Sequence, residues 1–144
     1  MTAKTNEIEN LLAAKSVQFQ LLPADEGDAV RQHWLSTFAA RVKKDTGVWV
    51  HNRFRWHGFS YGFQNAIEGE DAMVGYQDQW PAPYVVFDED DSWAYACTSA
   101  EYPDLTSLRS DIYVAHHGMK WTMAFTHEQP DIGPFWATKS DNAC

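Results

Sequence analysis

The clearest periodic signal in the chain is a stripe of apolar residues that recurs every four positions within residues 23–47. The stripe consists of Val30, Trp34, Phe38 and Val42, with Leu35 beside it. This spacing places side chains on one face of an α-helix, so we expect an amphipathic helix over residues 25–44. Asp25 is a suitable N-cap, and Gly47 can end the helix.

The middle of the chain predicts one short helix and one strand hairpin. Residues 70–79 follow Gly69, begin with acids and stop before Pro81, which is typical of a short helix. Residues 84–87 and 93–97 are apolar and are predicted to be strands that pair with Phe87 opposite Trp93. The acidic residues between them then form the hairpin loop.

A second hairpin is predicted around His117-Gly118, since glycine supplies the positive backbone angle that a two-residue turn needs. This turn pairs His116 with Met119, Val114 with Trp121 and Ile112 with Met123, all on one face that Phe125 continues. The other face is mixed and is expected to be half exposed; it carries Tyr113, Ala115, Lys120, Thr122 and Ala124.

Together these elements predict an α+β fold in which residues 1–144 form a single domain. We expect an antiparallel sheet of four or more strands whose apolar side packs against the 25–44 helix, with one or two short extra helices. Residues 48–63 are rich in aromatics and read as extended, and residues 1–15 form a short, weakly anchored helix or stay loose.

Composition supports a folded chain with a core of its own. Of the 144 residues, 44% are hydrophobic and 15% aromatic, which argues against disorder. No apolar run is long enough to span a membrane, and the N-terminus lacks the pattern of a signal peptide. Cys97 in a strand-like segment and Cys144 at the last position do not form a disulfide framework, so a cytoplasmic protein is expected.

The net charge of −9 is concentrated in one part of the chain. Residues 66–111 contain eleven acids and one base, Arg109. Such a surface repels nucleic acid and anionic lipid, so neither is an expected partner, whereas a basic protein would be attracted. The predicted partner-binding residues are the loop acids and their neighbours, namely Asp88, Glu89, Asp90, Asp91, Trp93, Asp71, Asp78 and Glu101.

The Thr126-His127-Glu128 segment raises the possibility of a metal site or a general base. If the strand before it stays regular, His127 faces the buried side and Glu128 points away, so we interpret His127 as architectural. The alternative is a small metal-dependent or ligand-binding enzyme that uses His57, His127 and Glu128. The spacing of these residues matches no metal motif, and we expect no cofactor.

The sequence also contains a match to a serine hydrolase motif and a partial match to a calcium-binding loop, and neither is supported by its surroundings. Gly58 to Gly62 matches the Gly-x-Ser-x-Gly pattern around Ser60, but no strand-turn-helix context is predicted there, so a serine hydrolase is not expected. The acidic loop at residues 88–91 lacks the glycine and the distant glutamate of a calcium loop.

Several motifs resemble an uncharacterised family of small bacterial proteins. They comprise Trp56, His57, Phe59 and Ser60; Asp111, Ile112, Tyr113 and Val114; Trp121, Thr122, Thr126, His127 and Glu128; and Gly133, Pro134 and Phe135. The resemblance implies no established activity. By analogy of type with small acidic bacterial proteins, we expect an immunity protein that occludes a cognate toxin. A plain regulatory or scaffold domain remains an open alternative.

Overall fold

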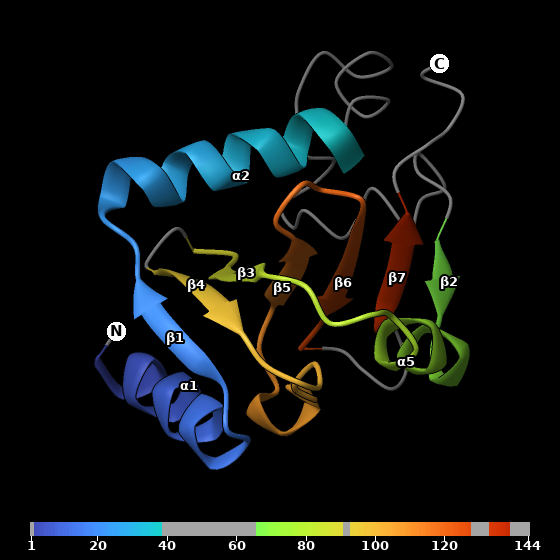
Figure 1. The fold of residues 1–144 in the computed structure, drawn as a ribbon, viewed down its shortest axis with the longest axis horizontal. Coiled ribbons are helices and arrows are strands. Elements are labelled where there is room, and N and C mark those ends of the chain that lie inside the picture. Colours follow the sequence, from blue (N-terminus) through green and yellow to red (C-terminus); the bar gives the residue numbers. More distant parts are fainter. Residues whose placement is uncertain (1, 39–65, 91–92, 128–132, 139–144) are drawn as a thin grey trace.

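The computed structural model describes residues 2–38, 66–90, 93–127 and 133–138, and the structural statements below refer to these residues. Element labels follow Figure 1. The helices are α1 (Thr2–Ala14), α2 (Ala24–Phe38), α5 (Glu70–Gln77) and the 3₁₀ helix η1 (Thr106–Leu108). The strands are β1 (Gln18–Leu21), β2 (Ile67–Glu68), β3 (Tyr84–Asp88), β4 (Ala94–Thr98), β5 (Ile112–His116), β6 (Trp121–Phe125) and β7 (Phe135–Thr138).

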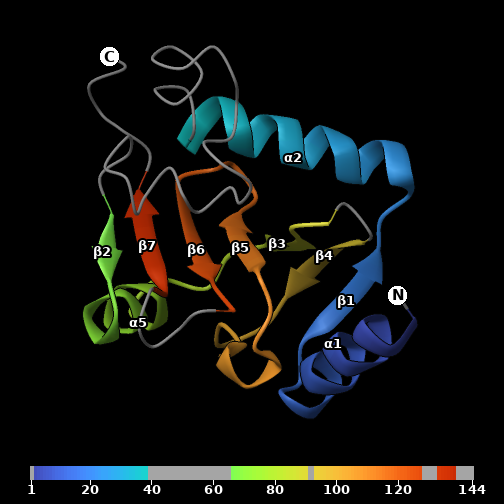
Figure 2. The same cartoon turned by 180° about the vertical axis from the view of Figure 1, so that it is seen from behind.

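The described strands form one seven-stranded sheet in the order β1-β4-β3-β5-β6-β7-β2, and every pairing is antiparallel. Helix α2 lies on one side of this sheet, and α1 and α5 lie on the other (Figure 1 and Figure 2). The α+β class and the helix-covered antiparallel sheet are therefore confirmed.

Both faces of the sheet are buried, in two separate clusters. On the α1 and α5 side, Ile8 and Tyr76 pack with large strand residues such as Trp121 and Phe125. On the α2 side, Trp34 packs against Tyr113 with ring centroids 5.1 Å apart. The strand residues around Trp34 include four alanines, whose small side chains leave room for the bulky residues of α2; they are Ala94, Ala115, Ala124 and Ala137.

The predicted placement of the long helix is wrong. We expected it on the apolar side of the second hairpin, but α2 covers the mixed side. The mixed side suits α2, because its alanines leave room for bulky residues and the Thr122 hydroxyl accepts a hydrogen bond from the Trp34 indole nitrogen at 2.8 Å. Trp34 and Thr122 are both fully buried. The apolar side is covered instead by α1 and α5, so the face expected to be half exposed is buried.

The second hairpin is shifted by two residues from its predicted register. Val114 pairs with Met123, not with Trp121. The Met119 amide donates to the His116 carbonyl at 2.8 Å, as in the predicted two-residue turn, but Met119 and not Gly118 has the positive φ of 59°, and strand pairing starts only at Ala115 with Thr122. A two-residue shift keeps each strand residue on its predicted face, except that Met119 in the turn packs with the α2 cluster.

The first hairpin is shifted by one residue, and this changes the faces. Phe87 pairs with Ala94, and Val86 pairs with Tyr95. Tyr95 and Trp93 therefore lie in the α1 and α5 cluster, while Phe87 lies in the α2 cluster. The prediction that Phe87 and Trp93 share a face is wrong, because an odd shift inverts one strand relative to its partner.

The predicted helices are confirmed, and some of the strands were not predicted. The helix at 70–79 is confirmed as α5, and α2 confirms the part of the long helix that lies within the described residues. Residues 2–14 form α1, which is well anchored because Ile8 and Leu12 are fully buried. Strands β1, β2 and β7 were not predicted. The aromatic segment 48–63 lies outside the described residues.

Candidate functional site

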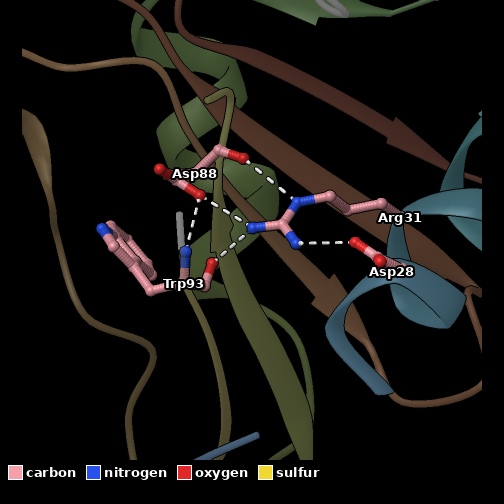
Figure 3. A network of polar contacts seen from close by, with 4 residues as sticks. All are labelled: Asp28, Arg31, Asp88 and Trp93. Carbon is pink, nitrogen blue, oxygen red and sulfur yellow. Dashed lines mark hydrogen bonds and ion pairs between the residues drawn. The ribbon is translucent and has the colours of Figure 1, made fainter. Parts of the chain in front are cut away.

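A buried arginine holds the end of β3 against the start of β4. Arg31 from α2 places Nη2 2.7 Å from Oδ1 of Asp88 and donates to the Trp93 carbonyl at 2.6 Å (Figure 3). The same Asp88 oxygen accepts from the Trp93 backbone amide at 3.1 Å. Asp88 is only 5% exposed. Asp88 was predicted to bind a partner as one of the loop acids, and that role stays a prediction; the structure shows that its carboxylate braces the hairpin from inside.

This braced corner forms one wall of a pocket of about 280 Å³, here called the acidic pocket. Four parts of the chain contribute to it: α1, the β3–β4 corner, the η1–β5 connection and the residue two positions beyond β6. Its lining residues are Glu7, Ile8, Asp88, Glu89, Asp90, Trp93, Leu108, Arg109, Ser110, Asp111, Ile112 and His127. The predicted acidic loop and the predicted histidine, which are 37 or more residues apart in sequence, thus meet at one site.

The electrostatic character of the acidic pocket is negative. Five of its lining residues are acids, and Arg109 is the one lysine or arginine among them. Glu89 accepts a hydrogen bond from the Tyr113 hydroxyl at 2.5 Å, and its amide donates to the Asp111 carbonyl at 3.1 Å. Glu89 is therefore fixed to β5, whereas Asp90 beside it is exposed.

His127 is not the buried strand-end residue that the sequence predicted. Strand β6 ends at Phe125, and the His127 side chain is 41% exposed. Its Nδ1 lies 2.9 Å from both carboxylate oxygens of Asp111, and its backbone amide donates to Asp111 Oδ1 at 3.0 Å. Because an ionised carboxylate only accepts hydrogen bonds, Nδ1 is the protonated ring atom. This fixes the orientation of the imidazole at the pocket.

Trp93 contributes an apolar ring to the acidic pocket, and its indole N–H makes no hydrogen bond. Its side chain is buried and lines the acidic pocket, and its indole nitrogen faces away from the Arg31 contacts in Figure 3. Among the buried side-chain nitrogen and oxygen atoms of the described residues, only this nitrogen has no hydrogen-bond partner. A buried donor of this kind is uncommon, since most are satisfied.

The other predicted partner-binding residues lie elsewhere. Asp71 is on α5, Asp78 is its C-cap, and Glu101 lies between β4 and η1; none of the three lines the acidic pocket. Asp91 and Glu128 lie outside the described residues, as do Trp56, His57 and Ser60. Whether His57 approaches His127 therefore stays an open prediction.

Thr126, Gly133 and Pro134 from the terminal motif serve the fold. Thr126 is fully buried, and a Cβ at Gly133 would lie 2.9 Å from its methyl carbon. Gly133 has a φ of 86° and donates its amide to Glu68 at 3.0 Å, while the Pro134 carbonyl accepts from Gly69. These contacts lock the start of β7 to β2 and α5.

The residues of the site that sequence reasoning missed include Glu7, Asp111 and Arg31. Glu7 belongs to a segment with no pattern that relates it to residues 88–127, so only tertiary packing reveals it. Asp111 was counted as an acid but not as the partner of His127. Arg31 lies within the apolar face of the predicted helix, three and four residues before Trp34 and Leu35, and a charged residue at such a position is a signal that was not used.

The described residues also bear on metal binding and on thiol chemistry. Within the described residues, no group of three or more His, Cys, Asp or Glu side chains is arranged to hold a metal ion. Cys97 is 3% exposed, and burial raises the pKa of its thiol to about 12. The expectation that Cys97 is buried is confirmed, and at neutral pH its thiol stays protonated.

Comparisons with known proteins place the chain in a family without supplying an activity. None of the helices described is both long and apolar enough to cross a bilayer. No curated protein and no solved structure matches the sequence. A family model described as a domain of unknown function, DUF4275, matches residues 6–136, which include every residue of the acidic pocket. The expected membership of an uncharacterised family is thus confirmed: the chain belongs to the DUF4275 family.

Proposed function

We propose that this chain is a protein-binding domain of the bacterial cytoplasm, and that it acts as an immunity protein by occluding a toxin with a basic surface. One observation carries the proposal. Acids from separate parts of the chain, including Glu7, Asp90 and Asp111, converge on one pocket that also has apolar walls.

The shape and chemistry of the acidic pocket suit an inserted lysine or arginine side chain. Its volume of about 280 Å³ lies just below the range of roughly 300–1,000 Å³ that is usual for small-molecule sites. Ile8 and Trp93 offer apolar contact to the methylene stem of such a side chain, while Glu7 and Asp90 offer carboxylates to its charged end. The surrounding negative charge would accelerate encounter with a basic partner.

The test uses the reading frame next to the gene for this chain, expressed in a bacterial host. If its product is the toxin, growth should stop without this chain and resume with it. The double variant Glu7→Gln/Asp90→Asn should lose protection. The control Asp25→Asn/Glu26→Gln removes the same charge from exposed residues of α2 that do not line the pocket, and it should protect fully.

Binding kinetics then test the occlusion itself. With the two purified proteins, the pocket variant should associate more slowly and with a weaker dependence on salt than the control. Protection that survives in the pocket variant, or a neighbouring product that harms no cell, would count against the proposal.

A second candidate is a small ligand-binding enzyme, and the His127–Asp111 pair favours it. A carboxylate on Nδ1 orients an imidazole and sets its tautomer, as in many general bases. The enzyme predicted from the sequence also uses His57 and Glu128.

The test is a screen of small amines and divalent metals. If this candidate is correct, at least one compound should raise the melting temperature of the native chain but not of His127→Gln. A screen in which no compound does so would remove this candidate.

A further inference from the structure

Trp80 is an unusually exposed tryptophan. Its exposure is 90%, compared with 67% for Val74 and 54% for Leu21, which are also among the exposed large apolar residues of the described chain. Tryptophan is on average highly buried, because its large apolar area makes exposure to water costly. An exposed ring of this size needs a reason, and partner binding is a common one.

The backbone beneath Trp80 is firmly held. The buried Tyr102 hydroxyl donates to the Trp80 carbonyl at 2.6 Å, and the side-chain amide of Gln77 donates back to the Tyr102 carbonyl at 3.1 Å. Tyr76, fully buried under α5, donates to the Pro103 carbonyl at 2.7 Å. The ring therefore projects from a rigid base, and little conformational entropy of the backbone would be lost on binding.

The outward face of α5 continues from Trp80 and is acidic. Asp71, Val74 and Asp78 follow a spacing of three and four residues, which puts them on one side of the helix, and all three are exposed. The sequence contains no lysine, arginine or histidine from residue 66 to residue 108. An exposed tryptophan two residues beyond Asp78, after a helix face that carries Asp71, is complementary to a basic surface. Arg109 lies beside another part of α5, where it lines a pocket with Glu70 and Met73.

We infer that Trp80, Val74, Asp71 and Asp78 form a docking surface, here called the Trp80 surface, for a basic protein. Trp80 enters an apolar pocket of that partner, and the two carboxylates face its lysines or arginines. The inference rests on the proposed function only in that the partner is basic, and it adds a surface that does not include the acidic pocket. A second copy of the chain fits poorly, because two acidic surfaces would repel each other.

The test is selection of short displayed peptides rich in lysine and arginine on the native chain. Enriched peptides should combine basic with apolar residues. Trp80→Ala should weaken their binding at least about tenfold, as expected for an anchoring tryptophan. Asp71→Asn/Asp78→Asn should weaken binding mainly at low salt. Leu21→Ala, which removes an exposed apolar side chain from β1, should leave binding unchanged.

Each remaining outcome overturns the inference. It fails if no peptide is enriched, or if Trp80→Ala binds the peptides as well as the native chain does. Peptides lost in Glu7→Gln/Asp90→Asn but kept in Trp80→Ala would support the acidic pocket and reject the Trp80 surface. A concentration-dependent dimer in sedimentation, abolished by Trp80→Ala, would assign the surface to a second copy instead.

Discussion

Arg31 and Asp88 form a buried ion pair, with 2.7 Å between Nη2 and Oδ1, across 57 residues of sequence. Their side chains are only 5% and 7% exposed. The pair joins α2 on one side of the sheet to the corner that shapes the acidic pocket. The stability of the fold and the geometry of the candidate site therefore depend on the same contact.

Arg31→Met should destabilise the fold by about 3–5 kcal/mol, because it leaves the Asp88 carboxylate buried without its cation. Urea unfolding at neutral pH measures this loss. The double variant Arg31→Met/Asp88→Asn should recover part of it, since no uncompensated charge remains. Asp28→Asn, which removes a solvent-exposed acid 3.9 Å from Arg31, should change little. An Arg31→Met variant as stable as the native chain would contradict the structural role.

Thr122→Val should cost about 1–3 kcal/mol, because the buried Trp34 indole nitrogen would lose its acceptor while the volume stays nearly constant. The measurement is a double-mutant cycle with Trp34→Phe in chemical denaturation. Thr122→Ser keeps the hydroxyl and should retain most of the coupling. Additive effects of Thr122→Val and Trp34→Phe would show that the hydrogen bond does not select the side on which α2 packs.

Gly133→Ala should destabilise the chain more than Gly69→Ala does. Both glycines have a positive φ, 86° and 77°, so both substitutions carry backbone strain. At Gly133 the added Cβ would also lie 2.9 Å from the Thr126 methyl carbon, whereas at Gly69 it meets nothing within 4 Å. Thermal unfolding of the two variants isolates the steric part. If both variants lose the same stability, the Thr126 side chain moves away from the added Cβ at no cost in free energy.

His116 should make stability depend on pH. Burial, with help from His117 and Lys120, lowers the pKa of His116 below its ordinary value of 6.5. The unfolded chain then binds a proton more readily than the folded one, so stability is lost as the pH falls through about 6.5 toward the folded pKa. His116→Asn keeps an acceptor for the Gly118 amide, which His116 Nδ1 now binds at 2.9 Å.

The measurement for His116 is the difference in unfolding free energy between pH 7.5 and pH 5. The native chain should lose more over this interval than His116→Asn, which shares all other titrating groups. An identical loss in both chains would show that His116 does not contribute.

Cys97 should resist alkylation in the folded state. With its pKa raised to about 12, only about one thiol in ten thousand is ionised at pH 8, and the side chain is buried. In a Cys144→Ser background, iodoacetamide should modify the native chain far more slowly than the urea-unfolded chain, as followed by mass spectrometry. Comparable rates would indicate that β4 opens readily.

Much of the fold was predictable because local periodicity and turn chemistry act over a few residues. The apolar stripe containing Trp34 and Phe38 predicted α2, and the segments around Val86, Tyr95, Val114 and Met123 predicted strands in their correct places. Both predicted hairpin registers were wrong, by one and by two residues. Phe87 pairs with Ala94 because packing on both faces of the sheet, and not loop length alone, sets the alignment.

The candidate site was predictable only in pieces. The acidic loop and His127 were singled out from the sequence. The sequence predicted a buried His127, which is exposed, and it did not reveal that Asp88 is buried. Asp88 became buried because Arg31 arrives from a distant helix to neutralise it. His127 is exposed because β6 ends two residues before it, at Phe125. Its imidazole then forms a hydrogen bond with the Asp111 carboxylate.

The sequence by itself determined helices α2 and α5, strands β3 to β6, the α+β class, the acidic middle of the chain and the buried state of Cys97. These follow from patterns within a few residues or from composition. Only the tertiary structure decided which face α2 covers, which carboxylates are paired and which line the acidic pocket. The physical reason is that these outcomes depend on contacts such as Trp34 with Thr122 and Arg31 with Asp88, which join residues 57 or more positions apart.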